Sequence, residues 1–360
     1  MKPKAAIIHD WLNGMRGGEK VLEEILGFFP EADIFTIFLD KKNISDKITA
    51  HKITPSPLNK YPFIRKHYKH FLPLFPAAVE EFNLNGYDMI ISSSHCAAKG
   101  VVPPPDSVHI SYIHSPMRYI WDQYYSYFGK TKGIKKSFIK RQVSRLKVWD
   151  VTASSRVDHF IANSHFVKKR IWRYYRREAA VIHPPVDTDF FQTAENPTRD
   201  YFLTVSALVP YKENDRLIEA FNKSGDPLIV VGKGSEEKKL KRRAGKNITF
   251  KKNLSARELK KLYQHAAAFV FAGVEDFGIA FVEAQACGTP VMAYKKGGVL
   301  DIVTEGTGIL FEEQTTEDLV DAIDKIKKNK FDPSFLRENS LKFSTGSFKK
   351  KFKEFLSQRL

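Results

Sequence analysis

The chain has 360 residues, of which 42% are apolar, and carries a formal net charge of +17. At ~150 residues a domain, this length predicts about two domains with ordinary apolar cores. No run approaches the ~18 consecutive apolar residues of a membrane span. Cys96 and Cys287 are far apart in the sequence and give no disulfide framework. We therefore expect a soluble protein of a reducing compartment, with no signal peptide in its first residues.

The positive charge is concentrated in part of the chain. Residues 130–178 contain 15 Lys or Arg against three acidic residues. Such a segment suits nucleic acid, an anionic membrane surface or a phosphorylated acceptor, because each of these presents negative charge. A solvated face with no dedicated partner is the alternative.

Apolar strand-like runs alternate with helical patterns along almost the whole chain. The first half has predicted strands at 5–10, 33–39, 87–94, 108–115, 159–164 and 179–183, and helices at 18–28 and about 133–157. Proline and polar residues at 184–200 then predict a hinge. The second half has predicted strands at 201–208, 227–232, 248–252, 267–272, 290–294 and 308–311, and helices at about 213–223, 235–243, 255–265, 279–287, 316–328 and 347–360.

This alternation predicts the fold class. Continuous apolar strands separated by helices are typical of parallel sheets covered on both faces. The sequence therefore indicates an α/β protein with two doubly wound, Rossmann-like halves. A ligand is expected in the cleft between the carboxyl ends of their strands.

Two features of the first half are candidates for a site. Gly17 and Gly18 lie between a strand and a helix, where they permit close backbone approach to an anion, with a purely conformational role as the alternative. His114 lies at the end of the strand 108–115, where α/β folds place site residues, and could bind a sugar hydroxyl or move a proton. A structural role is the alternative for His114 and for His95.

The most informative segment is EDFGIAFVEAQACGTP at 275–290. Its helix is apolar on nearly every side, which predicts a buried helix. Ionised Glu283 is costly there unless charge-assisted hydrogen bonds satisfy it, so we expect a polar partner. A vicinal diol would fit, and a neighbouring backbone group is the alternative. Glu275 lies just before the helix N-terminus, where backbone N–H groups form an anion site.

Other turns of the second half also follow predicted strands and would lie at the same edge of the sheet as Glu275. Lys212 follows a predicted strand and places a cation near the cleft, while glycine-rich turns at 232–234 and 297–298 precede helices. Each turn alone is ordinary strand-to-helix punctuation. Asp187 and Asp189 have the spacing of a metal-binding pair but follow two prolines in the hinge. We interpret them as turn residues, with Asp187 as a cap, and predict no metal site.

Taken together, these residues resemble the retaining glycosyltransferases of family 4, which have the GT-B architecture. The resemblance runs from the glycine pair to about residue 325. Its most specific match is Glu275 and Glu283 within EDFGIAFVEAQACGTPVMAY, accompanied by VSALVPYK, ANSHFVKKRI, HPPVDTDFF and GGVLDIV. The chain is similar in particular to mannosyltransferase-like members that build bacterial surface polysaccharides.

The resemblance implies a division of labour between domains. Residues 1–186 would form a Rossmann-like acceptor-binding domain, and residues 187–345 a Rossmann-like domain that binds the nucleotide-sugar. The amphipathic helix 346–360 would return toward the first domain.

The resemblance also implies roles for single residues. Glu283 would bind the ribose hydroxyls and Glu275 the hydroxyls of the transferred sugar, while Lys212 would neutralise the diphosphate leaving group. The implied catalytic residues are Glu275, His114 and Lys212. The implied donor-binding residues are Gly17, Gly18, Lys212, Asn253, Leu254, Glu275, Phe277, Gly278, Ile279 and Glu283.

The chain departs from the family pattern at one point. Many relatives carry a diphosphate-binding arginine at one of two places, which hold Ala207 and Glu213 here. Either Lys212 acts with a substitute cation such as Arg216 or Lys233, or stabilisation of the leaving group is weakened.

The activity that the resemblance implies is transfer of a hexose with retention of configuration, without a metal or other cofactor. GDP-mannose is the first choice of donor, followed by UDP-linked sugars, and the acceptor is a glycan or a lipid-linked sugar. Basic and aromatic residues at 56–76, with residues 130–178, predict peripheral binding to an anionic membrane surface on the cytoplasmic side.

Three other functions would each account for part of the sequence. A sugar-nucleotide-binding GT-B protein with weakened activity would follow from Ala207 and Glu213. A nucleic-acid-binding protein would explain the charge but leave the glutamate pair idle, and no nucleic-acid-binding module is visible, so nucleic acid is not the expected partner. An NAD-dependent oxidoreductase would need the GxGxxG spacing that the glycine pair lacks.

Overall fold

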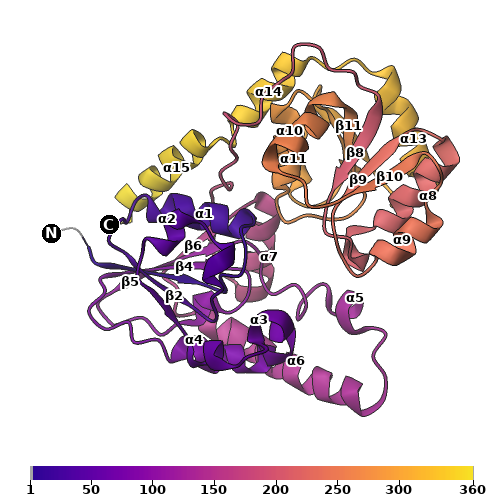
Figure 1. The fold of residues 1–360 in the computed structure, drawn as a ribbon. Helices are drawn as coiled ribbons and strands as arrows, with labels where there is room; N and C mark the ends of the chain where they lie inside the picture. The colour runs from indigo at the N-terminus through magenta and orange to yellow at the C-terminus, as the bar shows by residue number, and fades with distance from the viewer. Residues whose placement is uncertain (1–2, 360) are drawn as a thin grey trace. The chain divides into compact units, whose positions relative to one another are not determined.

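The computed structural model describes residues 3–359 and divides the chain into two compact units, Met1–His183 and Pro184–Leu360. Each unit is built around its own parallel sheet, with seven strands in the first unit and six in the second (Figure 1). The prediction of two doubly wound α/β halves is therefore confirmed. The predicted return of the C-terminal helix concerns how the units are arranged, and it stays a prediction.

The sheet of the first unit has the strand order β3-β2-β1-β4-β5-β6-β7. In chain order its strands are β1 (Ala5–His9), β2 (Asp33–Thr36), β3 (Ile53–Pro55), β4 (Met89–Ser94), β5 (Val108–Ile113), β6 (His159–Ala162) and β7 (Ala179–Val181). Its helices are α1 (Gly17–Leu26), α2 (Asp46–Thr49), α3 (Ile64–His67), α4 (Phe75–Glu80), α5 (Tyr124–Phe128), α6 (Gly133–Ser154) and α7 (His165–Tyr175).

The sheet of the second unit has the order β10-β9-β8-β11-β12-β13. Its strands are β8 (Tyr201–Val205), β9 (Leu228–Val231), β10 (Ile248–Lys251), β11 (Ala266–Phe271), β12 (Val291–Tyr294) and β13 (Gly308–Phe311). Its helices are α8 (Asn214–Ser224), α9 (Glu237–Arg243), α10 (Ala256–His265), α11 (Ile279–Ala286), α12 (Val299–Ile302), α13 (Thr316–Lys328), α14 (Pro333–Leu341) and α15 (Thr345–Ser357).

The predicted strands all form, and the sequence pattern missed a few other elements. Edge strand β3 is three residues long and ends in Pro55, which is tolerated because an edge strand pairs on one side only. Helix α7 begins after Ser164, whose hydroxyl accepts a hydrogen bond from the N–H of Val167. Helix α14 starts at Pro333, with Asp332 as its N-cap. These caps are local signals that the apolar pattern alone does not reveal.

Each sheet contains one topological switch point. In the first unit the chain runs from β1 outward through β2 and β3, and then returns to build β4 to β7 on the other side of β1. In the second unit the same happens at β8, which lies between β9 and β11. The loops after β1 and β4, and after β8 and β11, therefore diverge at the carboxyl ends of the strands. Ligands of open α/β sheets bind in such crevices.

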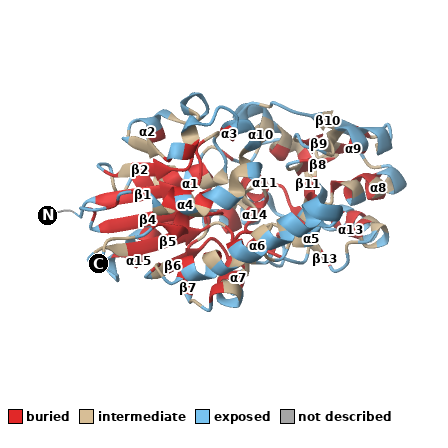
Figure 2. Cartoon of the chain, turned by 90° about the horizontal axis from the view of Figure 1, so that it is seen from below, coloured by how far each residue is buried: buried red, intermediate tan, exposed pale blue. Residues whose placement is uncertain are grey.

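Burial follows the pattern that the sequence predicts for covered parallel sheets. Strands β1, β4 and β5 of the first unit are buried almost throughout, seen in red in Figure 2. Strand β1, for example, is buried at all five positions. In the second unit helix α11 is buried at Phe281, Val282, Glu283, Ala284, Gln285 and Ala286. The prediction of a helix buried on nearly every side is thus confirmed.

Two further sequence interpretations can be compared with the structure. Asp187 acts as a cap, since its Oδ1 accepts a hydrogen bond of 2.9 Å from the N–H of Phe190. Both cysteines are buried and unpaired. Over residues 3–359, no helix combines the length and the apolar character needed to cross a membrane.

Buried His109 on β5 provides a test of the first unit. Its Nδ1 lies 3.1 Å from the carbonyl oxygen of Arg156 and its Nε2 lies 2.9 Å from the hydroxyl of Ser92. Burial lowers the pKa of His109 to about 4. In the unfolded chain the pKa of a histidine is about 6.5. Between about pH 6.5 and about pH 4, therefore, His109 is protonated in the unfolded chain but neutral in the folded unit.

We predict that the free energy of unfolding falls by about 2–3 kcal/mol between pH 7.5 and 4.5 because of His109 alone. Urea unfolding at the two pH values should show a smaller loss for His109→Gln than for the unsubstituted protein, since glutamine does not titrate. Equal losses in the two proteins would contradict this assignment.

Candidate functional site

The loop that follows β11 is held by glycines of a neighbouring turn. Glu275 pairs with Gly297 in an isolated parallel bridge, and the N–H of Gly298 donates a 2.8 Å hydrogen bond to the carbonyl oxygen of Glu275. A Cβ atom on Gly297 would lie 2.4 Å from that oxygen, and one on Gly298 would lie 2.4 Å from the Cα of Phe277. The glycine pair is therefore required by close backbone contact, which fixes the position of Glu275.

Lys212 reaches the same loop from the other side of the switch point. It ends the 3-10 turn η5 (Pro210–Lys212) after β8, and its side chain is 9% exposed. Its ammonium forms an ion pair with the carboxylate of Glu275, which is 24% exposed. Gly273 allows this approach, because a Cβ there would lie 3.0 Å from the Cα of Lys212. The structure thus brings together a buried cation and a partly exposed carboxylate that the sequence placed 63 residues apart.

Glu283 has the polar partner that its burial requires. It lies on α11 and is 7% exposed, and its Oε2 accepts a 3.0 Å hydrogen bond from the hydroxyl of Tyr263 on α10. Burial and the neighbouring Glu283 carboxylate raise the pKa of Tyr263 well above its usual value, so this hydroxyl keeps its proton and remains a donor. Tyr263 is a residue that sequence reasoning missed, since the pattern of α10 marks it simply as an apolar position.

The other predicted donor-binding residues lie around this pair. Gly278 is the N-cap of α11 and has φ of 101°, a conformation that favours glycine, and buried Phe277 precedes it. Ile279, the first residue of α11, and Leu254 both pack against the apolar core that contains Phe277. Asn253 lies in the turn between β10 and α10 with a left-handed φ of 57°. These residues all belong to the carboxyl edge of the second sheet.

One of the two places where the resemblance implies an arginine holds Glu213, which forms an ion pair with Arg216. Glu213, directly after Lys212, has a left-handed φ of 53°. Its Oε2 accepts a 2.8 Å hydrogen bond from Nε of Arg216, whose Nη1 also donates to the carbonyl oxygen of Gln314. Lys233 is exposed in the turn after β9. Of the two proposed substitute cations, Arg216 is therefore already neutralised by Glu213.

In the first unit His114 belongs to a cluster that the sequence revealed only in part. Its Nε2 lies 2.8 Å from the hydroxyl of Ser93, and the same hydroxyl lies 3.0 Å from Nδ1 of His9. The backbone of Gly18 passes both rings, because a Cβ there would lie 3.6 Å from Nε2 of His114 and 3.6 Å from Cε1 of His9. The sequence contained a signal for both residues, because His9 is the last residue of β1 and Ser93 the last but one of β4, the two strands that flank the switch point.

Gly17 and Gly18 form the first turn of α1 rather than a loop before it. Glu19 follows them, and its Oε2 accepts a 3.0 Å hydrogen bond from the N–H of Arg16, which closes the helix N-terminus. Backbone N–H groups of a first turn point out of the helix and attract anions. The predicted close approach of this backbone to an anion is compatible with that geometry and stays a prediction.

His95 makes contacts that are compatible with the structural alternative. Its Nδ1 lies 3.1 Å from Oδ2 of buried Asp10, and its ring contacts the Trp11 ring edge-on at 4.4 Å. Asp10 also accepts hydrogen bonds of 2.6 to 2.8 Å from the N–H groups of His95, Cys96, Ala97 and Ala98. The carboxylate therefore fastens the end of β4 to the end of β1.

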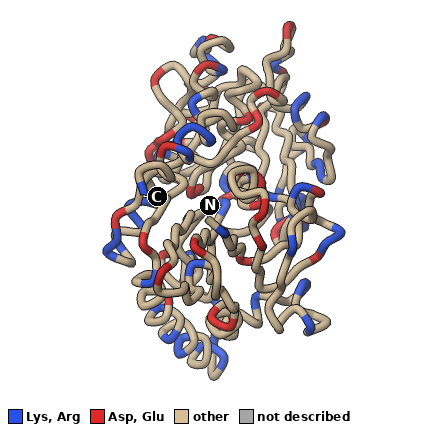
Figure 3. Tube along the Cα trace, turned by 90° about the vertical axis from the view of Figure 1, so that its left-hand side faces the viewer, with Lys and Arg blue, Asp and Glu red and all other residues tan. Residues whose placement is uncertain are grey.

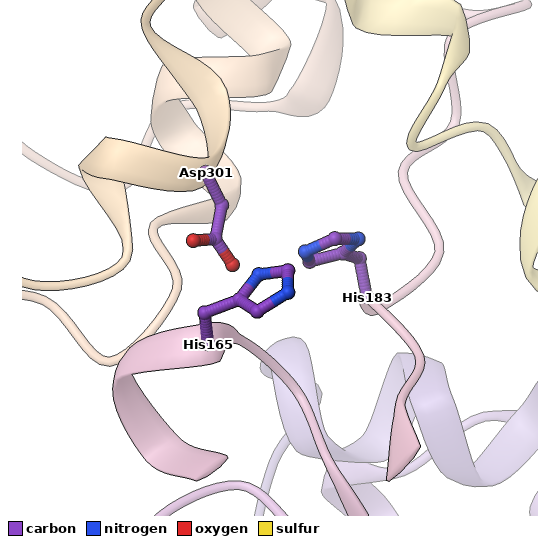
Figure 4. Close-up of side chains that lie close together, drawn as sticks. All are labelled: His165, His183 and Asp301. Carbon is purple, nitrogen blue, oxygen red and sulfur yellow. The ribbon is translucent and has the colours of Figure 1, made fainter. Parts of the chain in front are cut away.

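Two further histidines of the first unit lie near each other. His165 begins α7 and His183 follows β7, and their ring centroids are 6.1 Å apart (Figure 4). They come from the loops after β6 and β7, one and two strands beyond β5 in the sheet. His165 and His183 therefore follow other strands of the sheet than β1 and β4, which carry His9 and Ser93.

Comparisons with known proteins agree with this architecture. The protein is 30% identical over 203 residues to an uncharacterized glycosyltransferase of Methanocaldococcus jannaschii, covering 53% of this chain and 56% of the relative. It is 34% identical over 141 residues to a GDP-mannose-dependent monoacylated alpha-(1-6)-phosphatidylinositol monomannoside mannosyltransferase of Corynebacterium glutamicum, covering 33% of this chain and 36% of the relative. The chain thus spans about half, or less, of the length of these curated relatives.

The fold is shared with solved structures at low sequence identity. Anabaena HepE, solved in complex with UDP and glucose, superposes with a TM-score of 0.73 at 17% identity, covering 98% of this chain and 99% of HepE. At that identity the likeness shows the fold, which is GT-B. Residues 16–190 match the family described as Glycosyltransferase Family 4, and residues 185–343 match Glycosyl transferases group 1. Over residues 16–343, therefore, the chain consists of a family 4 glycosyltransferase domain followed by a group 1 glycosyltransferase domain.

Proposed function

We propose that this protein transfers a hexose from a nucleotide-sugar to a glycan or lipid-linked acceptor, with retention of configuration and without a metal, in the synthesis of a cell-surface polysaccharide. The observation that carries the proposal is the ion pair of Lys212 and Glu275 at the switch point of the second sheet. It brings a cation for a diphosphate and an acceptor for sugar hydroxyls to the crevice where α/β folds bind their ligands.

The pair suggests how the donor is received. A buried ammonium without a counter-charge is costly, and Glu275 supplies that charge before the ligand arrives. A diphosphate would take over Lys212, which frees the carboxylate of Glu275 to accept hydrogen bonds from the sugar. Glu283 would bind the ribose diol through its carboxylate, with Tyr263 fixing one oxygen. Stabilising the charge that develops on the leaving diphosphate is then the main catalytic contribution.

The chemistry that fits these groups is a front-face displacement. We propose that the leaving diphosphate itself accepts the proton of the acceptor hydroxyl, so that Glu275 orients the sugar and does not attack it. No pair of carboxylates flanking the reacting bond, as used by retaining glycosidases, is required by this scheme. An isolable glycosyl adduct on Glu275 would contradict it.

For the donor we propose GDP-mannose first. The relative of Corynebacterium glutamicum is named for its dependence on GDP-mannose, which supports this choice. A UDP-linked hexose is the second candidate, and the UDP and glucose bound in the HepE structure favour it. Asn253 and Leu254, in the turn after β10, are proposed to lie beside the base and thus to take part in this choice.

The basic part of the first unit is proposed to bind an anionic membrane surface from the cytoplasmic side. Helix α6 exposes Ile134 at 90% and Phe138 at 59%, and α5 exposes Tyr125 at 84%. Around these apolar side chains α6 carries Lys135, Lys136, Lys140, Arg141 and Arg145, all exposed. Figure 3 marks the lysine and arginine positions in blue along the trace. Exposed aromatic and aliphatic side chains among cations are typical of helices that lie in a membrane interface.

Helix α6 packs against the first unit through Asp150. Its exposed side chains, among them Ile134 and Phe138, lie on the surface. Buried Asp150 accepts hydrogen bonds from Nζ of Lys99, from Nε1 of Trp121 at 2.8 Å and from the hydroxyl of Tyr175 at 2.9 Å. The exposed apolar side chains of α6 are not part of the core of their own unit, and we propose that a membrane covers them.

The alternative is a protein that binds a sugar nucleotide and turns it over slowly. It is favoured by Ala207 and Glu213, which stand where many relatives carry an arginine, and by the neutralisation of Arg216 by Glu213. Under this alternative the donor binds but the leaving group is poorly stabilised.

The first prediction from the proposed function concerns donor binding. A nucleotide-sugar at ~100 times its dissociation constant should stabilise the protein by about 2.7 kcal/mol, seen as a rise in melting temperature without added metal. Glu283→Ala should abolish the rise, and Tyr263→Phe should weaken binding by about tenfold, because Oε2 of Glu283 loses its donor. Exposed Glu312→Ala serves as the control. If none of GDP-mannose, UDP-glucose and UDP-N-acetylglucosamine raises the melting temperature, the donor site is wrong.

A second prediction separates catalysis from binding. Lys212→Met should lower kcat by about 10²–10³, the usual effect of removing a group that stabilises developing charge. Arg216→Met should change kcat by less than about threefold, because Glu213 already neutralises Arg216. Exposed Lys238→Met is the matched control. A large loss of kcat in Arg216→Met with little loss in Lys212→Met would show that Arg216, and not Lys212, stabilises the leaving group.

A third prediction tests the membrane surface. Co-sedimentation with vesicles that contain anionic lipid should weaken with added salt, and Ile134→Ser with Phe138→Ser should reduce binding by at least about tenfold through lost apolar burial. Phe335→Ser, which removes an exposed phenylalanine of the second unit, is the control. Salt-insensitive binding, or none, would remove the membrane proposal.

A further inference from the structure

Arg170 on α7 holds both ends of the loop that follows β5. Its Nη1 donates a 3.0 Å hydrogen bond to the hydroxyl of Ser115, and its Nη2 donates a longer one of 3.4 Å to the carbonyl oxygen of Pro116. The same Nη2 donates a 2.7 Å hydrogen bond to Oδ1 of Asp122. One side chain therefore ties residue 115 to residue 122, and the chain between them forms a closed loop.

Two rings of α7 flank this guanidinium. Its Cζ lies 5.7 Å from the ring centroid of Phe166 and 5.9 Å from that of Tyr174, one turn before and one turn after Arg170 on the helix. Tyr174 also stacks on Trp121 of the loop, with ring centroids 4.6 Å apart and an interplanar angle of 12°. Helix α7 therefore contacts the loop both through the cation and through a ring beside it.

The core of the first unit and helix α6 hold the same loop. Met117 and Ile120 are buried in this core, at 1% and 0% exposure. Nε1 of Trp121 donates a 2.8 Å hydrogen bond to Oδ2 of Asp150 on α6. Within the loop, the N–H groups of Ile120 and Trp121 donate to the carbonyl oxygen of Met117 at 3.1 and 3.2 Å. The loop is therefore anchored along its length as well as at its ends.

The ion pair of Arg170 and Asp122 is explained by conformation rather than by stability. The side chain of Arg170 is 7% exposed and that of Asp122 is 34% exposed. Removing a guanidinium from water is costly, and attraction to a carboxylate roughly returns that cost, so such a pair adds little net stability. Met117 and Ile120 pack in the core without help from the cation. A charged clamp on two ends does, however, select one arrangement of the loop.

The loop lies at the carboxyl edge of the first sheet. It follows β5, which pairs in parallel with β4, one of the strands that flank the switch point. His114, for which the proposed function implies a catalytic role, directly precedes the loop, and its carbonyl oxygen accepts a 2.9 Å hydrogen bond from Nδ2 of Asn163. The edge at which open α/β sheets bind ligands thus carries a loop that is already fixed.

We propose that Arg170 is a positioning residue of the acceptor site: it closes loop 115–122 into a fixed wall that orients the acceptor glycan for transfer. The assignment of this wall to an acceptor glycan rests on the proposed function, whereas the closure of the loop depends only on side chains of the first unit. Arg170 acts through the loop. A fixed wall raises the rate of transfer because the acceptor hydroxyl is held in the reactive orientation.

Hydrogen exchange of the full chain, without ligand, tests the closure of the loop. In Arg170→Met a flexible apolar side chain replaces the guanidinium. We expect the amides of Ile120, Trp121 and Gln123, which donate hydrogen bonds within this segment, to exchange at least about fivefold faster than in the unsubstituted protein. Arg170→Lys keeps the charge but lacks the planar fork, and should give a smaller increase.

Arg177→Met is the matched control. Arg177 also clamps a turn of the first unit, through hydrogen bonds to the carbonyl oxygens of Ser154, Val157 and Asp158. That turn precedes β6 and therefore lies at the opposite edge of the parallel sheet. Arg177→Met should leave exchange in loop 115–122 unchanged. Equal exchange of the loop in the two methionine variants would overturn the proposal.

A second variant keeps the test decisive if Arg170→Met fails to fold. Asp122→Asn removes the charge of the same contact from the partly exposed side. It should speed exchange of the loop amides at least about twofold, because a neutral amide oxygen is a weaker acceptor for the guanidinium. Unchanged exchange in Asp122→Asn would count against the clamp.

Transfer of mannose from GDP-mannose to octyl α-mannoside, used as an acceptor probe, tests the consequence. Arg170→Met should lower kcat at least about tenfold, while the KM for GDP-mannose stays within about twofold, because the donor is proposed to bind the second unit. Arg177→Met should change neither constant. A normal kcat in Arg170→Met, with the loop loosened, would overturn the positioning role.

The two measurements distinguish failure of the inference from failure of the proposed function. If the unsubstituted protein transfers no mannose and no nucleotide-sugar raises its melting temperature, the proposed function is wrong. Faster exchange of the loop in Arg170→Met would then still establish the clamp and remove only the acceptor glycan from it. Transfer by the unsubstituted protein together with unchanged exchange in Arg170→Met would keep the function and overturn the clamp.

Discussion

The polarity of the parallel strands is the constraint on which both candidate sites depend. All strands of a sheet end at the same edge, and at β1 and β8 the chain departs to both sides, so the loops after these strands and after β4 and β11 diverge. The crevices that result must be lined by whatever residues follow the strands. In the first unit those residues are histidines and a serine, and in the second they are a lysine and a glutamate.

Each edge then has to neutralise the charge that it buries. Asp10 does so with four backbone N–H groups at the end of β4, an arrangement that also sets the backbone of His95. Lys212 and Glu275 do so with each other at the carboxyl edge of the second sheet. The two arrangements differ, because Asp10 is held by four backbone N–H groups and the His95 ring, whereas Glu275 is paired with the side chain of Lys212. The need to satisfy buried charge is thus met by backbone groups at Asp10 and by a side-chain ion pair at Lys212 and Glu275.

Much of this could be predicted from the sequence, and the reasons differ by residue. Apolar runs placed all the strands except short β3, and the all-apolar character of α11 correctly required a partner for Glu283. The identity of that partner, Tyr263, could not be predicted, since it depends on how α10 packs against α11. The same holds for Ser93: strand ends predict that His9, Ser93 and His114 lie at one edge, but not that one hydroxyl bridges two rings. Glycines 297 and 298 were noted as a turn, and the structure adds that the neighbouring backbone excludes any side chain there.

The local structure after β8 engages one of its positive charges within the protein. A glutamate in a left-handed conformation is unfavourable by itself, and Glu213 adopts it at the junction between η5 and α8. There its carboxylate binds Arg216, so a positive charge close to the crevice is cancelled rather than supplied to a ligand. Lys212 stays beside Phe271 with Glu275 as its counter-charge. An anion bound at this edge would thus meet Lys212, while Arg216 stays engaged by Glu213.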